Sequence, residues 1–321
     1  MISFRSLLGA TILVCAATLA SAQDFPNKPI RLVLGFPPGG STDIAARIVA
    51  AKLKETLGQP VIVENRPGAD GILAANLVAR SPADGYTLMI GTTSVMTVNP
   101  VMYEKLSYDP IKDFDPVTLI GLVPVVIAVQ PSLPIRNTKE LIEYARANPG
   151  KLNYAAAATA HILATELFKQ MANIEMRSIP YKGSASAVAG MLSGDTQVIF
   201  VEGAAMISHL KSGRLRGIAV TTAKRVTDLP DLPTVIESGL PEYEMVLFNG
   251  LFAPAGTPRP VKMKLQSEVE RFAQSREGQE KFAAAGGLVA VGSTPEFLAE
   301  TVKRYVERNT MVVRRGNLKP N

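Results

Sequence analysis

Residues 28–58, KPIRLVLGFPPGGSTDIAARIVAAKLKETLG, restrict the fold more than any other stretch of the chain. Residues 30–34 are an apolar run with one charge, which predicts a buried strand. The prolines and glycines of residues 36–40 end it, because proline lacks an amide donor and glycine favours turns. Apolar residues spaced by four then predict a helix, with Ser41 or Thr42 as its N-cap. Such a turn leaves backbone amides free at a positive helix end, which is a site for a carboxylate or a phosphate.

The same order of strand, turn and helix recurs along the chain, which predicts an α/β protein. A second unit begins with a strand at residues 153–157 and a turn of small residues that ends at His161. Long apolar runs at residues 117–130 and 246–253 are expected to cross between two lobes, with Pro124 interrupting the first run. We therefore predict that residues 23–124 and 246–321 form lobe 1, and that residues 125–245 form lobe 2. Two lobes joined in this way close on a ligand by a hinge motion.

The first 22 residues have the pattern of a cleavable secretory signal peptide. Arg5 precedes an apolar run from residue 7 to residue 20, and Ala20-Ser21-Ala22 matches a cleavage site. The run is too short to span a bilayer. The chain has a single cysteine, Cys15, and it lies inside this segment, so the mature protein has no disulfide and no cysteine ligand for a metal.

Composition and motifs favour a binding protein over an enzyme. The net charge of +6 comes from scattered lysines and arginines, and the chain has no tryptophan, so a nucleic-acid surface is not indicated. Only two histidines, His161 and His209, could act as a general base of that type. The chain has no Walker loop, dinucleotide fingerprint, zinc-protease motif or nucleophile elbow, so we expect no catalytic residue, cofactor or metal.

Hydroxyl side chains and small residues mark further candidate positions for a ligand. Thr92, Thr93 and Ser94 follow the strand predicted at residues 86–90, at the end where open α/β sheets bind ligands. Their alternative role is to cap the segment that follows. His161 is expected at a helix start that faces the cleft.

Motifs along the whole mature chain resemble those of the Bug receptors, the periplasmic substrate-binding proteins of tripartite tricarboxylate transporters. The first is Phe36-Pro37-Pro38-Gly39-Gly40-Ser41-Thr42-Asp43, followed by Arg47. The other matching segments occur in the expected order at residues 63–69, 84–88, 113–114, 149–154, 180–183, 232–235 and 253–258.

The resemblance implies a two-lobed type II periplasmic-binding-protein fold with a carboxylated ligand in the cleft between the lobes. It implies ligand contacts from both strand–helix turns and from the third loop of lobe 1, at Phe36, Gly39, Gly40, Ser41, Thr42, Thr92, Thr93, Ser94, Ala158, Thr159, His161 and Glu202. The expected protein is a monomeric periplasmic receptor that delivers its ligand to the membrane components of a transporter. Reporting to a sensor kinase and a secreted enzyme of organic acids are the alternatives.

Four departures from the family pattern bear on the ligand. The turn at residues 155–160 is alanine-rich where the family has more Gly and Ser, so a more apolar pocket is expected. Glu202 stands where the family often has an Asp that meets an amino or hydroxyl group. Phe248 replaces a common Trp, and Asp70 replaces a common Gly. Citrate, dicarboxylates, amino acids and aromatic acids all stay open as ligands.

Overall fold

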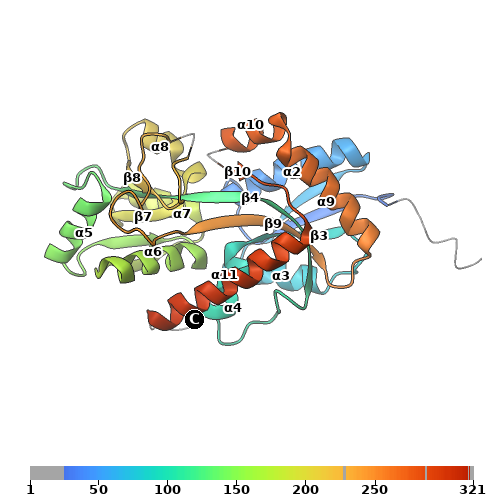
Figure 1. Cartoon of the computed structure of the whole chain (residues 1–321), viewed down its shortest axis with the longest axis horizontal. Coiled ribbons are helices and arrows are strands. Elements are labelled where there is room, and N and C mark those ends of the chain that lie inside the picture. Colours follow the sequence, from blue (N-terminus) through green and yellow to red (C-terminus); the bar gives the residue numbers. More distant parts are fainter. Residues whose placement is uncertain (1–24, 227–228, 286–287, 317, 319–321) are drawn as a thin grey trace, which may run out of the picture.

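The computed structural model describes residues 25–226, 229–285, 288–316 and 318. The predicted signal peptide, residues 1–22, lies outside the described residues. Figure 1 shows an elongated molecule in which helices flank a twisted sheet of ten strands. The sheet order is β2-β1-β3-β9-β4-β7-β5-β6, with β10 and β8 paired to β4.

Lobe 1 begins with three parallel strands and the helices between them. Its first elements are β1 (Ile30–Leu34), α2 (Ser41–Leu57), β2 (Val61–Asn65), α3 (Ile72–Ala79), β3 (Thr87–Thr92), the π-helix η2 (Ser94–Val98) and α4 (Asn99–Met102). Both β2 and β3 pair with β1 in parallel, as the strand–helix–strand pattern predicts. The chain returns to lobe 1 at its end with α9 (Arg259–Gln274), α10 (Arg276–Ala284), β10 (Val289–Ala290) and α11 (Pro295–Arg315).

In lobe 2, strands again alternate with helices, and its strands form the other part of the same sheet. Its elements are α5 (Thr138–Ala147), β5 (Asn153–Ala156), α6 (Thr159–Ala172), β6 (Arg177–Pro180), α7 (Ser184–Ser193), β7 (Val198–Glu202), α8 (Ile207–Lys211) and β8 (Arg216–Val220). β5 pairs in parallel with both β6 and β7. The carboxyl ends of β5 and β7 therefore lie at the same edge of this sheet, where ligands of α/β proteins bind.

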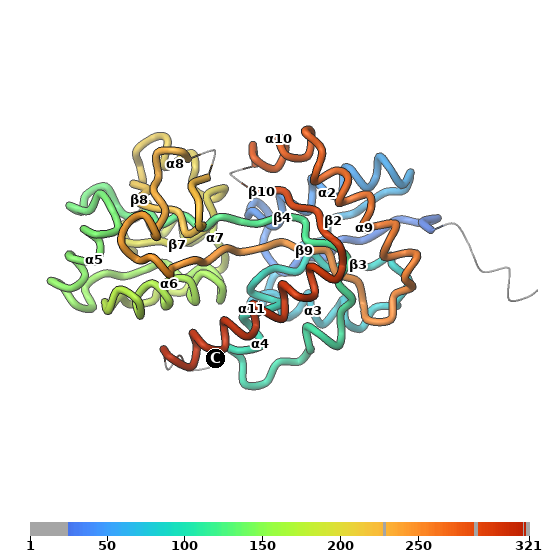
Figure 2. The backbone as a smooth tube through the Cα atoms, in the orientation of Figure 1, coloured from blue at the N-terminus to red at the C-terminus, as the bar shows by residue number. Residues whose placement is uncertain are grey.

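Two antiparallel strands, β4 (Phe114–Val129) and β9 (Val246–Pro254), connect the lobes. The two strands run side by side through the middle of the molecule in Figure 2. The expected interruption at Pro124 is wrong: β4 is continuous, and Pro124 lies opposite Val246 at the end of the β4–β9 pairing. From Val125 onward β4 pairs with β7, so proline stands where the strand changes its neighbour.

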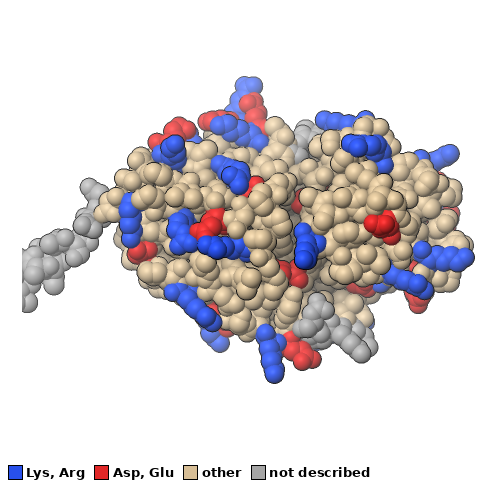
Figure 3. Space-filling model, turned by 180° about the vertical axis from the view of Figure 1, so that it is seen from behind, with Lys and Arg blue, Asp and Glu red and all other residues tan. Residues whose placement is uncertain are grey.

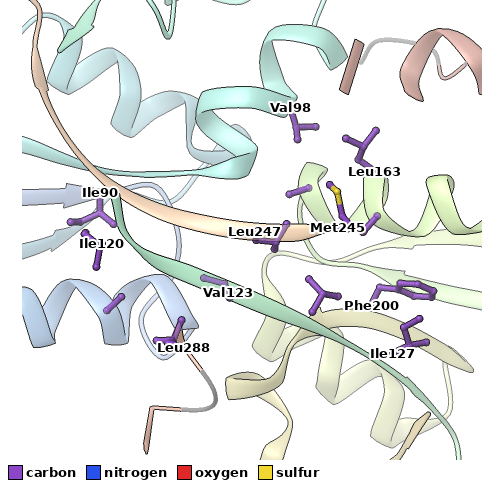
Figure 4. Packing of buried hydrophobic residues seen from close by; sticks show 14 of the residues in the cluster. Ile90, Val98, Ile120, Val123, Ile127, Leu163, Phe200, Met245, Leu247 and Leu288 are labelled. Atoms are coloured by element: carbon purple, nitrogen blue, oxygen red, sulfur yellow. The ribbon is translucent and has the colours of Figure 1, made fainter. Parts of the chain in front are cut away.

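Apolar side chains fill the region around β4 and β9 without a break. Val123 on β4 and Leu247 on β9 lie at the crossing in Figure 4, with Ile90 towards lobe 1 and Phe200 towards lobe 2. All four are buried in one hydrophobic cluster. On the face that Figure 3 shows, acidic and basic side chains are interspersed, in agreement with the scattered charge in the sequence.

Candidate ligand-binding site

The turn from β1 into α2 forms the lobe 1 wall of the site. Gly40, with φ −82° and ψ 169°, is the N-cap of α2, and no side chain caps this helix. The prediction of Ser41 or Thr42 as N-cap is therefore wrong, because Ser41 is already the first helical residue. Within the described residues the amides of Ser41, Thr42 and Asp43 have no acceptor, since the first helical bond runs from Ile44 N to Gly40 O.

Asp43 holds this turn in shape and does not face the cleft with a free charge. Its carboxylate accepts hydrogen bonds from the Gly39 amide at 3.1 Å, from the Arg47 guanidinium at 2.9 and 3.0 Å, and from Asn65 Nδ2 at 2.9 Å. Asn65 also donates to the Phe36 carbonyl. Burial raises the pKa of Asp43, but the bonds from Arg47, Asn65 and Gly39 outweigh it, and the pKa is lowered.

The loop after β3 packs the lobes together. Thr93 Oγ1 accepts from the Phe248 amide of β9 at 2.7 Å, and Ser94 Oγ accepts from the Ala160 amide of α6 at 3.2 Å. Thr92, Thr93 and Ser94 are all buried. This loop therefore both lines the cleft and ties lobe 1 to the start of α6.

Most of the first amides of α6 in lobe 2 are already engaged by protein groups. Ala158 is the N-cap, again without a side-chain cap. Ala160 N bonds to Ser94, while His161 N and Ile162 N both bond to the Ala158 carbonyl. Thr159 Oγ1 donates to Asn99 Oδ1 of lobe 1 at 2.8 Å, and the Thr159 side chain is fully buried.

Glu202, the last residue of β7, and His161 of α6 form a buried pair in the lobe 2 wall. Their atoms Oε2 and Nε2 are 3.0 Å apart, and the side chains are 6% and 8% exposed. Neither ring nitrogen of His161 has an aligned hydrogen-bond partner within the described residues, so the contact is defined by its distance alone. Burial opposes ionisation of Glu202, but His161, the backbone and Ser184 outweigh it and lower the pKa of Glu202 to about 2.

These walls enclose a cleft of about 660 Å³, counting the space open to solvent. Ten of the twelve residues predicted to bind ligand line it, namely Phe36, Gly40, Ser41, Thr42, Thr92, Thr93, Ser94, Ala158, His161 and Glu202. Gly39 and Thr159 do not line it. Gly39 (φ +90°) shapes the turn through its bond to Asp43, and Thr159 bonds to Asn99 across the lobes.

Sequence reasoning did not select several residues that line the cleft. Lys182 and Ser184 come from the turn between β6 and α7, whose strand–turn–helix pattern was visible in the sequence. Asn249 is the single polar residue of β9 and accepts from Thr42 Oγ1 at 3.1 Å, so its isolation in an apolar run was a signal. Val123 and Leu247 gave no signal, because apolar residues on a crossing strand look like ordinary core.

Comparison with known proteins identifies the family. Residues 45–318 match the family model described as "Tripartite tricarboxylate transporter family receptor". The chain belongs to this family. Its members are periplasmic solute-binding receptors, and within the described residues no helix is long and apolar enough to cross a membrane.

Relatives and solved structures of this family are similar to the chain over nearly its full length. It is 35% identical over 312 residues to the protein BugT of Bordetella pertussis, covering 94% of this chain and 95% of BugT. It is 37% identical to the structure titled "R. palustris Rpa4515 with adipate", with a TM-score of 0.90 and coverage of 93% and 100%. It is 30% identical to the structure of MatC from Rhodopseudomonas palustris with bound malate, with a TM-score of 0.83 and coverage of 90% and 100%. The predicted two-lobed periplasmic-binding-protein fold is thereby confirmed.

Proposed function

We propose that this receptor binds a small carboxylic acid in the cleft, with the ligand carboxylate on the first-turn amides of α2. The observation that carries the proposal is that the amides of Ser41, Thr42 and Asp43 lack acceptors within the described residues, in a helix of 17 residues. The three residues also line the cleft. Free amides and the helix dipole together favour an anion at this point.

Two further findings support a carboxylate in particular. The structures of the relatives from R. palustris are of Rpa4515 with adipate and of MatC with bound malate, and both ligands are carboxylates. In this chain the Asp43–Arg47–Asn65 network fixes the turn, so the amides are already oriented before a ligand arrives. A preorganised site loses less entropy on binding.

Membership of the family supports the biological role that we propose. The receptor acts after cleavage of residues 1–22, works as a monomer without catalysis, and passes its ligand to the membrane components of a tripartite tricarboxylate transporter. Its lobes, residues 23–124 with 246–321 and residues 125–245, close on the ligand about β4 and β9. A sensor kinase as recipient is the competing role, and a binding assay with each purified partner separates the two.

The test is isothermal titration of the mature protein with mono-, di- and tricarboxylic acids, followed by analysis of the acids recovered. We expect one-site binding of at least one acid and its recovery unchanged. Chemical conversion of a bound acid would overturn the receptor role, and failure of every acid to bind would overturn the carboxylate site.

A further inference from the structure

Asn249 interrupts an apolar face of the crossing strand β9. Successive side chains of a strand point to opposite faces, so Leu247, Asn249, Leu251 and Ala253 share one face. The other three belong to one hydrophobic cluster, and Leu247 lies in the packed crossing of Figure 4. Asn249 is only 2% exposed. Burying an amide there is costly unless its polar atoms find partners.

The amino group of Asn249 has no partner of this kind in the protein. Among the described residues three asparagines are buried, Asn99, Asn249 and Asn309. Nδ2 of Asn99 donates to the Asp70 carbonyl, and Nδ2 of Asn309 donates to the Thr97 carbonyl. Nδ2 of Asn249 donates to no group within the described part of the chain. Asn249 also lines the cleft, so its unused donor is available to a bound molecule.

The position of Asn249 brings this donor to the start of α2. Thr42 Oγ1 donates to Oδ1 of Asn249 at 3.1 Å, which fixes the orientation of the carboxamide. The backbone amide of Thr42 is one of the three at α2 that lack acceptors within the described residues. An ionised carboxylate has about four acceptor positions, so one that rests on these amides can accept from a further donor.

The sheet is irregular at the same point. Gly121 of β4 lies opposite Asn249, and Leu119 lies opposite Gly250, so β4 has one more residue than β9 between the two pairs. Bulges of this kind are common next to functional sites, where they alter the direction of a side chain.

We propose that Asn249 binds the ligand, with Nδ2 donating a hydrogen bond to the carboxylate that rests on the amides of Ser41 and Thr42. The inference rests on the proposed function, since it takes the ligand carboxylate to be at α2. The Thr42 hydroxyl is then a positioning group, because it orients the carboxamide of Asn249. The carboxylate thereby contacts β9, which connects the lobes, as well as the turn before α2.

The variant Asn249→Leu removes the donor and continues the apolar face of β9. Titration calorimetry of the unmodified mature protein with citrate, succinate, glutamate and benzoate first selects the acid of lowest Kd as the probe. In Asn249→Leu the Kd for this probe should rise at least about tenfold, because a hydrogen bond to a charged group is lost. The Tm should stay close to that of the unmodified protein or rise, since an apolar side chain replaces a buried amide. An unchanged Kd would overturn the inference.

Thr42→Val is the matched control. It removes the same side-chain hydrogen bond but keeps Nδ2 of Asn249 and the amide of residue 42. Its Kd should be at least about tenfold below that of Asn249→Leu. Equal losses in the two variants would show that Asn249 only holds Thr42 in place, which overturns the inference and leaves the carboxylate site at α2 intact. Binding of none of the four acids by the unmodified protein would overturn both.

Asn249→Asp tests the same contact with a side chain of nearly unchanged shape, and it decides the question if the leucine variant does not unfold cooperatively. A carboxylate replaces the donor and repels the carboxylate of the probe. The Kd at pH 7 should therefore rise at least about a hundredfold over that of the unmodified protein, the loss of the hydrogen bond and the repulsion together. A Kd within about threefold of the unmodified protein would overturn the inference.

Discussion

The helices α2 and α6 begin in the same way but differ in what their first amides contact. Each follows a parallel strand and a turn of small residues, and neither has a side-chain cap. At α2 the first three amides lack acceptors within the described residues. At α6 only the first, that of Thr159, lacks one there, because the Ala160 amide is bound by Ser94 and the next two bond to Ala158. The same local pattern has therefore left three amides open at α2, while at α6 most of the first amides are engaged by protein groups.

The two helix starts also differ in how the nearest carboxylate is placed. At α2 the nearby carboxylate of Asp43 bonds to its own turn and to Arg47, so it does not occupy the open amides. At α6 the nearby carboxylate of Glu202 is buried and faces the cleft with His161. Lobe 1 is thus suited to receive an anion, and lobe 2 presents an acceptor of its own.

Of the substitutions that test this difference between α2 and α6, Gly40→Val should have the largest effect, a loss of ligand affinity. The backbone at Gly40 is extended, so valine fits without strain, and its side chain points into the cleft towards Glu202. We expect affinity for the tightest carboxylic acid to fall at least about a hundredfold, equivalent to the loss of two hydrogen bonds to a charged group. Titration calorimetry measures this, with exposed Ala51→Val on the same helix as the control. An unchanged Kd would show that the turn before α2 is not part of the binding site.

Asn65→Leu should have the next largest effect. It removes two hydrogen bonds that hold the β1–α2 turn in shape, and it changes no charge. The amide of Asn65 donates to both Phe36 and Asp43, and leucine removes both bonds. We expect the free energy of unfolding to fall by about 1–3 kcal/mol. Affinity should fall by about tenfold as the turn loses its preorganisation. Gln274→Leu, which replaces an exposed amide on α9, is the control. Full affinity in Asn65→Leu would show that the turn is rigid without the network.

Ser94→Ala tests the contact between Ser94 of lobe 1 and the Ala160 amide at the start of α6. The variant leaves the buried Ala160 amide without its acceptor, so urea unfolding should show a loss of about 1–3 kcal/mol. If the ligand carboxylate binds at α2, as proposed, affinity should change by less than about threefold, a difference below 1 kcal/mol. The control is Ser267→Ala, a half-buried serine on α9 whose hydroxyl bonds to the Lys264 carbonyl of the same helix. An affinity loss as large as that of Gly40→Val would place the carboxylate at α6 instead.

The last prediction concerns the charge of Glu202 in lobe 2. Its pKa is lowered from 4.5 to about 2 in the folded protein, so its ionised form stabilises the fold fully above about pH 4.5. That contribution disappears as the pH falls towards 2. Unfolding free energies measured between pH 7 and pH 2 should therefore fall more steeply in the wild type than in Glu202→Gln. Equal slopes in the two proteins would contradict an ionised Glu202 in the folded state.

Local patterns explain why much of the fold was predictable. Strand β1, helix α2 and the parallel pairing of β1 with β2 follow from apolar spacing, Pro/Gly punctuation and crossover handedness. Pro124 misled the prediction for β4, because its place at the exchange of strand neighbours depends on the tertiary structure.

The site was predictable where it lies in turns and not where it depends on partners across the lobes. Ser41 and Thr42 could be selected from the strand–turn–helix order alone. The bond from Thr159 to Asn99 spans 60 positions in the chain, and no local signal indicates it. The same holds for the contact of Ser94 with Ala160, which decides that the amides of α6 are engaged.

A crystal structure of the mature protein with its tightest-binding carboxylic acid tests the central claim most directly. We predict that the ligand carboxylate accepts hydrogen bonds from the amides of Ser41 and Thr42, while Ser94 keeps its bond to Ala160. A carboxylate on the amides of α6, with Ser94 displaced and the amides of α2 left to water, would contradict it.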